Sequence, residues 1–183
     1  VYPLNNITIN RAQGSYVWDN DGVQYLDMYG GHAVISIGHT HPHWVKRIQT
    51  QLEKIAFYSN SIIIPLQQEL ADKLGLISGK TDFQLFLCNS GAEANENALK
   101  LAFHKRAPAN RIFAFEKCFS GRTLGLSFVT DKAAYRVGLP KTLEVDYLPF
   151  FDENDPKGST QRCVEVMKKY FKRFPKQHAC FLF

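Results

Sequence analysis

From residue 83 onward, short apolar runs alternate with segments of helical spacing, and this alternation limits the fold more than any other feature. Helical patterns start near residue 90 and near residue 160. Strands that alternate with helices are typical of a mainly parallel sheet covered by helices on both faces. We therefore predict an α/β fold. The runs expected to form its strands are FQLFLCN (83–89), RIFAFE (111–116), TLEVDYLPF (142–150) and ACFLF (179–183).

The first part of the chain follows a different pattern. Two alternating runs within residues 14–29 are separated by Asn20-Asp21-Gly22, which is typical of a hairpin turn. Apolar residues at three- and four-residue spacing then predict an amphipathic helix over 43–56. A second helix is expected to begin at Pro65, a residue favoured in the first helical turn, and to end between Gly75 and Gly79.

Composition narrows the classes of function. The net charge of +5 arises from 22 basic residues scattered among 17 acidic ones, which does not favour nucleic-acid binding. No apolar run approaches the ~18 residues of a membrane span. Three of the four cysteines lie within apolar runs, and none has C-x-x-C spacing. We expect a soluble, cytoplasmic protein that interacts with neither nucleic acid nor membrane.

The stretch CNSGAEANENALKLA (88–102) joins an expected strand to an expected helix. Ser90 and Glu93 fit the S-x-x-E capping box, so the helix should begin at Ser90. Gly91 and Ala92 then leave backbone N–H groups at the positive end of the helix, where an anion such as phosphate can bind. From these residues alone, an ordinary glycine-containing turn remains the alternative.

Three histidines in HTHPH (39–43) raise the alternative of a metal site. Alternate residues of an extended strand point to the same side, so His39, His41 and His43 could converge on zinc. Pro42 and the helical pattern that follows favour a junction between a loop and a helix instead. We predict no metal site. A nucleophilic role for Cys118 is also disfavoured, because no base lies near it in the sequence.

Three blocks, NSGAEANENALKLA (89–102), DNDGVQYLDMYGGHAVISIGHTHP (19–42) and CFSGRT (118–123), together resemble the class III, fold-type I, pyridoxal-phosphate-dependent aminotransferases. Within that family the resemblance is to the acetylornithine aminotransferase branch, and it extends along the whole chain. It implies that residues 1–60 form an arm and helix of a small domain. Residues 61–183 would be the first part of the large cofactor-binding domain, whose sheet would be incomplete here.

The resemblance also implies site residues. Ser90, Gly91 and Ala92 would hold the cofactor phosphate, and Phe119 would stack on the pyridine ring. Arg122 would bind a substrate carboxylate, and His32, in a loop that lies near the amine substrate in the family, would contact the donor. Two of these regions depart from the family pattern: Ser120 stands where a histidine is common, and His32 where relatives often carry an aliphatic residue or tyrosine.

The function implied is transfer of the terminal amine of N-acetylornithine, or a similar N-acyl diamino acid, to 2-oxoglutarate in arginine biosynthesis. The enzyme would be a homodimer with shared active sites, to which FYSNS (57–61) would contribute. No catalytic residue is assigned within the chain, because the Schiff-base lysine is expected downstream of Phe183. Residues 1–183 alone are therefore expected to be inactive.

The alternative functions are those of an ornithine, succinylornithine or acylated-lysine-precursor aminotransferase, an inert fragment or paralogue, and an unrelated α/β metal- or nucleotide-binding protein.

Overall fold

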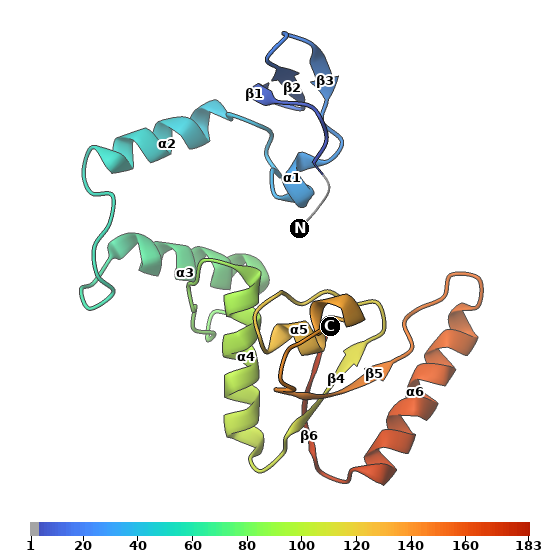
Figure 1. Ribbon diagram of the computed structural model, residues 1–183. Helices are drawn as coiled ribbons and strands as arrows, with labels where there is room; N and C mark the ends of the chain where they lie inside the picture. The colour runs from blue at the N-terminus through green and yellow to red at the C-terminus, as the bar shows by residue number, and fades with distance from the viewer. Residues whose placement is uncertain (1–3) are drawn as a thin grey trace. The chain divides into compact units, whose positions relative to one another are not determined.

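The computed structural model describes residues 4–183, and the contacts within the chain divide it into two compact units (Figure 1). The first unit ends at Lys73 and the second runs from Leu74 to Phe183. The domains expected at 1–60 and 61–183 stay a prediction, because compact units of this kind do not define the domains of a family.

The first unit contains a small antiparallel sheet with the strand order β1-β2-β3. Its strands are β1 (Ile9–Gln13), β2 (Tyr16–Asp19) and β3 (Gln24–Leu26). The predicted hairpin is confirmed: β2 and β3 pair around Asn20-Asp21-Gly22. Asp19 stabilises this turn because its carboxylate accepts hydrogen bonds from the Val23 N–H at 2.9 Å and the Tyr25 hydroxyl at 2.7 Å. Strand β1 was not predicted.

Three helices follow: α1 (Gly30–Ala33), α2 (Pro42–Leu52) and α3 (Pro65–Ser78). The two longer ones were predicted, and both begin with a proline, whose missing N–H has no helical partner in the first turn in any case. Helix α2 ends four residues before the expected boundary at 56. Helix α3 continues past Gly75 and ends just before Gly79, which has a φ of +69°, a conformation that favours glycine.

The second unit is built on a parallel sheet with the order β5-β4-β6, as the alternating pattern predicted. Its strands are β4 (Arg111–Phe115), β5 (Glu144–Leu148) and β6 (His178–Leu182). Helix α4 (Gly91–Arg106) leads to β4, and α6 (Pro156–Arg173) connects β5 to β6. Two short helices, α5 (Leu126–Val129) and the 3-10 turn η1 (Ala133–Tyr135), lie between β4 and β5. No helix within residues 4–183 is long and apolar enough to cross a membrane.

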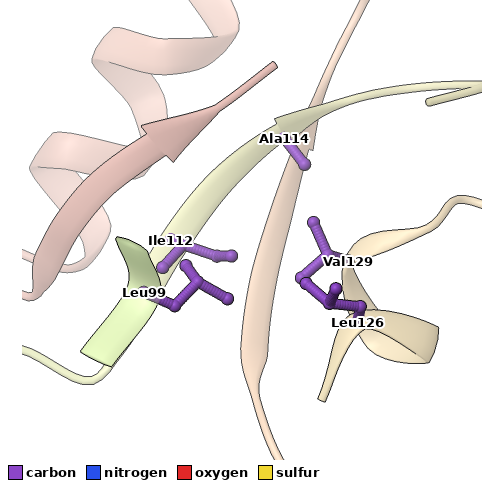
Figure 2. Close-up of a cluster of buried hydrophobic side chains, with 5 residues drawn as sticks. All are labelled: Leu99, Ile112, Ala114, Leu126 and Val129. Atoms are coloured by element: carbon purple, nitrogen blue, oxygen red, sulfur yellow. The ribbon is translucent and has the colours of Figure 1, made fainter. Parts of the chain in front are cut away.

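Alternate residues of β4 point to opposite faces of the sheet, and helices cover both faces. Ile112 and Ala114 are fully buried against one face, in a cluster with side chains from α4 and α5 (Figure 2). Phe113 lies on the other face, where its ring contacts Tyr170 and Phe171 of α6. The expected arrangement of a parallel sheet between helices is therefore confirmed.

Two expectations about this unit were wrong. Residues 83–89 form no strand, and Phe83 and Phe86 are 69% and 60% exposed. An apolar run becomes a strand only when a neighbouring strand accepts its hydrogen bonds, and no strand among residues 4–183 pairs with this one. The helix expected from near residue 160 was placed too late. Helix α6 instead begins at Pro156, because the Asp155 carboxylate caps it by accepting the Gly158 N–H at 3.0 Å.

A largely buried ionic cluster joins all three strands, through the first residues of β4 and β6 and the central residue of β5. The Arg111 guanidinium of β4 donates two hydrogen bonds to Asp146 of β5, at 2.7 and 2.6 Å. His178 of β6 donates from Nε2 to the same carboxylate at 2.7 Å. Burial alone would raise the pKa of Asp146, but the hydrogen bonds from Arg111 and His178 outweigh it and hold that pKa below its ordinary value.

Leu99→Ala should lower the free energy of unfolding by about 3 kcal/mol, because it opens a cavity in the cluster of Figure 2. Leu101→Ala is the matched control: it makes the same change two residues along α4, at a side chain that is 64% exposed. That variant should stay within about 0.5 kcal/mol of the wild type. Urea unfolding measures both, and equal losses would contradict the packing described here.

Asp146→Asn should lower the free energy of unfolding by about 3 kcal/mol at pH 7, because Arg111 and His178 both lose their buried carboxylate and Arg111 keeps only the half-buried Glu144, at 3.3 Å. The pKa of Asp146 is lowered by folding, so its contribution is present above the unfolded-state value near 4 and is lost as the pH falls through the folded-state value. The gap between variant and wild type should therefore shrink at pH 3. Asp82→Asn, at an exposed side chain, is the control, and urea unfolding measures both variants at both pH values. If Asp146→Asn lowers the free energy of unfolding equally at pH 3 and pH 7, the pKa of Asp146 is not lowered by folding.

Candidate functional site

Helix α4 begins as predicted, with Ser90 as its N-cap residue. The Ser90 hydroxyl accepts the Glu93 N–H at 3.2 Å. The Glu93 carboxylate in turn accepts the Asn89 N–H at 2.8 Å, so the return bond of the capping box reaches one residue further back than the motif implies. Hydrogen bonds from Asn89, first from its side chain and then from its backbone, hold the pKa of Glu93 below its ordinary value. This carboxylate therefore stays ionised at neutral pH and is engaged with residues 89 and 90.

The first turn of α4 offers backbone donors to a ligand. The first helical hydrogen bond comes from Ala94, whose N–H donates to the Ser90 carbonyl at 3.1 Å. Gly91 and Ala92 come before it, where a helix supplies no acceptor for their N–H groups. A Cβ added at Gly91 would meet no atom within 4 Å, so the space beside this residue is open. Partial positive charge and open space together suit an anion.

The loop that follows β4 packs directly against this first turn. Gly121 has a φ of +141°, a conformation that other residues rarely adopt. A Cβ at this position would lie 2.7 Å from Cδ1 of Leu126 and 3.0 Å from Cβ of Ala92. Only glycine lets the backbone approach both side chains. Gly121 therefore brings the two flanking residues, Ser120 and Arg122, next to the N-terminus of α4.

Two side chains of α4 hold the same loop, although nothing in the sequence alone marked either as a site residue. The Asn95 amide donates to the Ser120 carbonyl at 2.9 Å. Glu96 accepts a hydrogen bond from the Thr123 hydroxyl at 2.5 Å. Each lies four residues after Gly91 or Ala92, which puts it on the same face of the helix. That spacing was the available clue, but it had no meaning before the position of the loop was known.

These elements enclose a cavity of about 540 Å³. The helix contributes backbone N–H groups, Phe119 contributes an aromatic ring that is 61% exposed, and Arg122 contributes a guanidinium. Such a cavity can take an anion at the helix end, a flat ring against Phe119 and a carboxylate at Arg122. Its lining consists of Gly91, Ala92, Asn95, Phe119, Ser120, Gly121, Arg122 and Thr123.

The structure brings together four of the six residues predicted for the site: Gly91, Ala92, Phe119 and Arg122. Ser90 caps the helix directly before them. His32 belongs to the first unit, where it has a φ of +61° and its ring nitrogens contact the Tyr29 hydroxyl. The predicted roles of all six in ligand binding remain predictions.

The histidines of residues 39–43 and a second cavity are the competing candidates for a site. His39 donates to the Asp27 carboxylate at 2.7 Å, which fixes the loop before α2. Within residues 4–183, no group of three or more His, Cys, Asp or Glu side chains could hold a metal ion. The second cavity, of about 610 Å³, lies beside residues 149–154. Its lining includes Arg162, whose guanidinium already pairs with Asp155 at 2.7 Å.

Residues 2–183 match the family described as aminotransferase class-III. The acetylornithine aminotransferase of Archaeoglobus fulgidus is 42% identical over 158 residues, which are 86% of this chain and 40% of that protein. The acetylornithine aminotransferase of Shewanella oneidensis is 41% identical over 148 residues, 78% of this chain and 36% of that protein. The chain thus spans about 40% of the length of the relatives it matches.

Solved structures share the fold over nearly the whole chain. The taurine:2-oxoglutarate aminotransferase of Bifidobacterium kashiwanohense, in complex with PLP and glutamate, has a TM-score of 0.85 and 24% identity over 98% of this chain and 42% of that one. An (S)-enantioselective omega-transaminase of Thermomicrobium roseum has a TM-score of 0.82 and 25% identity over 99% of this chain and 46% of that one. The predicted fold class is confirmed.

Proposed function

The chain belongs to the class-III aminotransferase family, and on that premise we propose that it is part of an enzyme that transfers the terminal amine of N-acetylornithine, or a similar N-acyl diamino acid, to 2-oxoglutarate. The cofactor of this family is pyridoxal phosphate. One observation carries the proposal: a helix N-terminus, an aromatic ring and a guanidinium line a single cavity. Relatives named acetylornithine aminotransferase, at about 40% identity, support the choice of donor.

The residues of the cavity fit this cofactor. The open space at Gly91 allows a phosphate to approach the N–H groups of Gly91 and Ala92, which a side chain at position 91 would obstruct. The exposed ring of Phe119 offers a face on which the pyridine ring can stack. Ser90 contributes by fixing the start of the helix, since its hydroxyl occupies the Glu93 N–H. We assign these four residues to cofactor binding.

Arg122 is assigned to the carboxylate of the substrate. Its planar guanidinium can donate two parallel hydrogen bonds to a carboxylate and thereby fix the orientation of the whole molecule. 2-Oxoglutarate and the amino-acid donor both carry such a group. His32 keeps its proposed role in contacting the donor, which rests on its position in the sequence after Gly30-Gly31.

When bound, pyridoxal phosphate supplies an aldehyde that reacts with amines and a ring that withdraws electrons from the substrate carbon. The residues of this chain bind and orient the reactants, and we assign no proton transfer to any of them. The lysine that would react with the aldehyde stays a prediction beyond Phe183. Assembly as a homodimer with shared active sites, a contribution from residues 57–61, arginine biosynthesis and a cytoplasmic location likewise belong to the proposal.

The donor is tested with the full-length protein, purified with pyridoxal phosphate and supplied with 2-oxoglutarate. Glutamate formation should show the highest kcat/KM with N-acetylornithine. A higher value with ornithine, succinylornithine or an acylated lysine precursor would overturn the choice of donor but retain the aminotransferase. No glutamate from any donor, with the cofactor retained, would identify an inert paralogue.

Gly91→Ala tests the phosphate site separately from the fold. Apart from its chain neighbours and the backbone of its own helix, the added methyl group has no protein atom within 4 Å, so urea unfolding without cofactor should show no loss of stability. It would, however, stand where the phosphate approaches the backbone. We expect the Kd for pyridoxal phosphate, measured by fluorescence titration, to rise about tenfold, equivalent to about 1.4 kcal/mol. An unchanged Kd would remove the phosphate from this helix end.

A further inference from the structure

Thr130 is a buried polar residue that the proposed function does not use. It follows α5 directly and is only 2% exposed. Its hydroxyl accepts the N–H groups of Ser120 at 3.0 Å and Gly121 at 3.3 Å, and it donates to the Gly121 carbonyl at 2.9 Å. A hydroxyl has one proton and two acceptor sites. All of them are directed at the two residues that lie between Phe119 and Arg122.

The neighbours of Thr130 fasten the start of the same loop. The Asp131 N–H donates to the Cys118 carbonyl at 3.0 Å, and its carboxylate accepts the Lys117 N–H at 2.8 Å. The Cys118 thiol donates to the Val129 carbonyl at 3.2 Å. Residues 129–131 therefore run alongside residues 117–121 and bond to them at several successive positions. Thr130 bonds to Ser120 and Gly121, which line the cavity.

This segment is in turn anchored to the sheet by Tyr147 of β5. The Tyr147 hydroxyl donates to the Phe128 carbonyl at 2.6 Å and also lies 3.4 Å from the Thr130 carbonyl oxygen. Arg136 donates to that hydroxyl at 2.7 Å. Burial raises the pKa of Tyr147, so the hydroxyl keeps the proton that it donates. Hydrogen bonds thus connect a strand of the sheet, through residues 128–130, to the loop that carries Phe119 and Arg122.

We propose that Thr130 is a positioning residue for substrate binding: its hydroxyl holds the Ser120-Gly121 backbone so that Arg122 can receive the carboxylate and Phe119 the ring. The inference rests on the proposed function, which assigns those two ligands. Asn95 holds the loop from the opposite side, but only at the Ser120 carbonyl. Thr130 bonds to both N–H groups of the turn and to the Gly121 carbonyl. A loop without them samples other conformations, and a guanidinium that is misplaced by about 1 Å loses its two-point contact.

The test compares Thr130→Val, which keeps the shape but removes the hydroxyl, with Thr130→Ser, which keeps the hydroxyl. In the full-length holoenzyme, Thr130→Val should raise the KM for 2-oxoglutarate at least tenfold with a much smaller change in kcat. Thr130→Ser should remain within about threefold of the wild type. Tyr147→Phe should shift KM in the same direction by less, because it loosens the anchor and not the loop itself. It also serves as the informative variant if Thr130→Val does not fold.

A second readout does not need activity. Hydrogen exchange of the peptide that contains Ser120 and Gly121 should be about tenfold faster in Thr130→Val and near normal in Thr130→Ser. Phe113→Leu is the control, because it weakens packing on the opposite face of the sheet and should change neither this exchange nor KM.

The outcomes separate the two proposals. Unchanged exchange in Thr130→Val overturns the positioning role, and so does faster exchange with an unchanged KM. If Phe113→Leu raises the KM as well, the rise in Thr130→Val reflects general destabilisation, and the positioning role is overturned too. If the wild type forms no glutamate from any donor, the proposed function fails, and the exchange comparison alone decides whether Thr130 holds the loop.

Discussion

The central position of β4 is the constraint on which the rest of the second unit depends. It pairs in parallel with β5 on one edge and β6 on the other, so the backbone hydrogen bonds of this strand are satisfied within the sheet. A parallel sheet needs cover on both faces. Ile112 and Ala114 therefore pack against α4 and α5, while Phe113 packs against α6 (Figure 2). The loop of the candidate site follows directly after the carboxyl end of this strand.

The two ends of this sheet serve different purposes. Toward the amino-terminal end, Arg111 and His178 both donate hydrogen bonds to the buried carboxylate of Asp146, which ties the three strands together. At the carboxyl end, Phe119 and Arg122 line a cavity, and the loop that bears them is fastened mainly through its backbone. Hydrogen bonds to the backbone fix the course of the loop without using the ring of Phe119, which is how a loop can be both well positioned and functional.

Features that depend on neighbouring residues were predictable. The turn at Asn20-Asp21-Gly22, the cap at Ser90 and the starts of α2 and α3 each follow from a few consecutive residues. The apolar run at 83–89 shows the limit of such reasoning. Its composition is that of a buried strand, yet strand formation needs a partner, and none among residues 4–183 lies beside it. Family resemblance identified Phe119 and Arg122, which local physics would have left as an ordinary aromatic and a turn residue.

The sequence by itself determined the α/β class, the helix start that offers N–H groups at Gly91 and Ala92, and membership of an aminotransferase family. Local hydrogen bonding and hydrophobic spacing are enough for the first two. Only the tertiary structure decided that Gly121 fits between Ala92 and Leu126, and that Thr130 directs its hydroxyl at the same turn. The contact of Gly121 with Ala92 joins residues 29 positions apart, and the bond from Thr130 spans nine positions across the α5 segment. Their meaning depends on how the helices pack on the sheet, which no local pattern encodes.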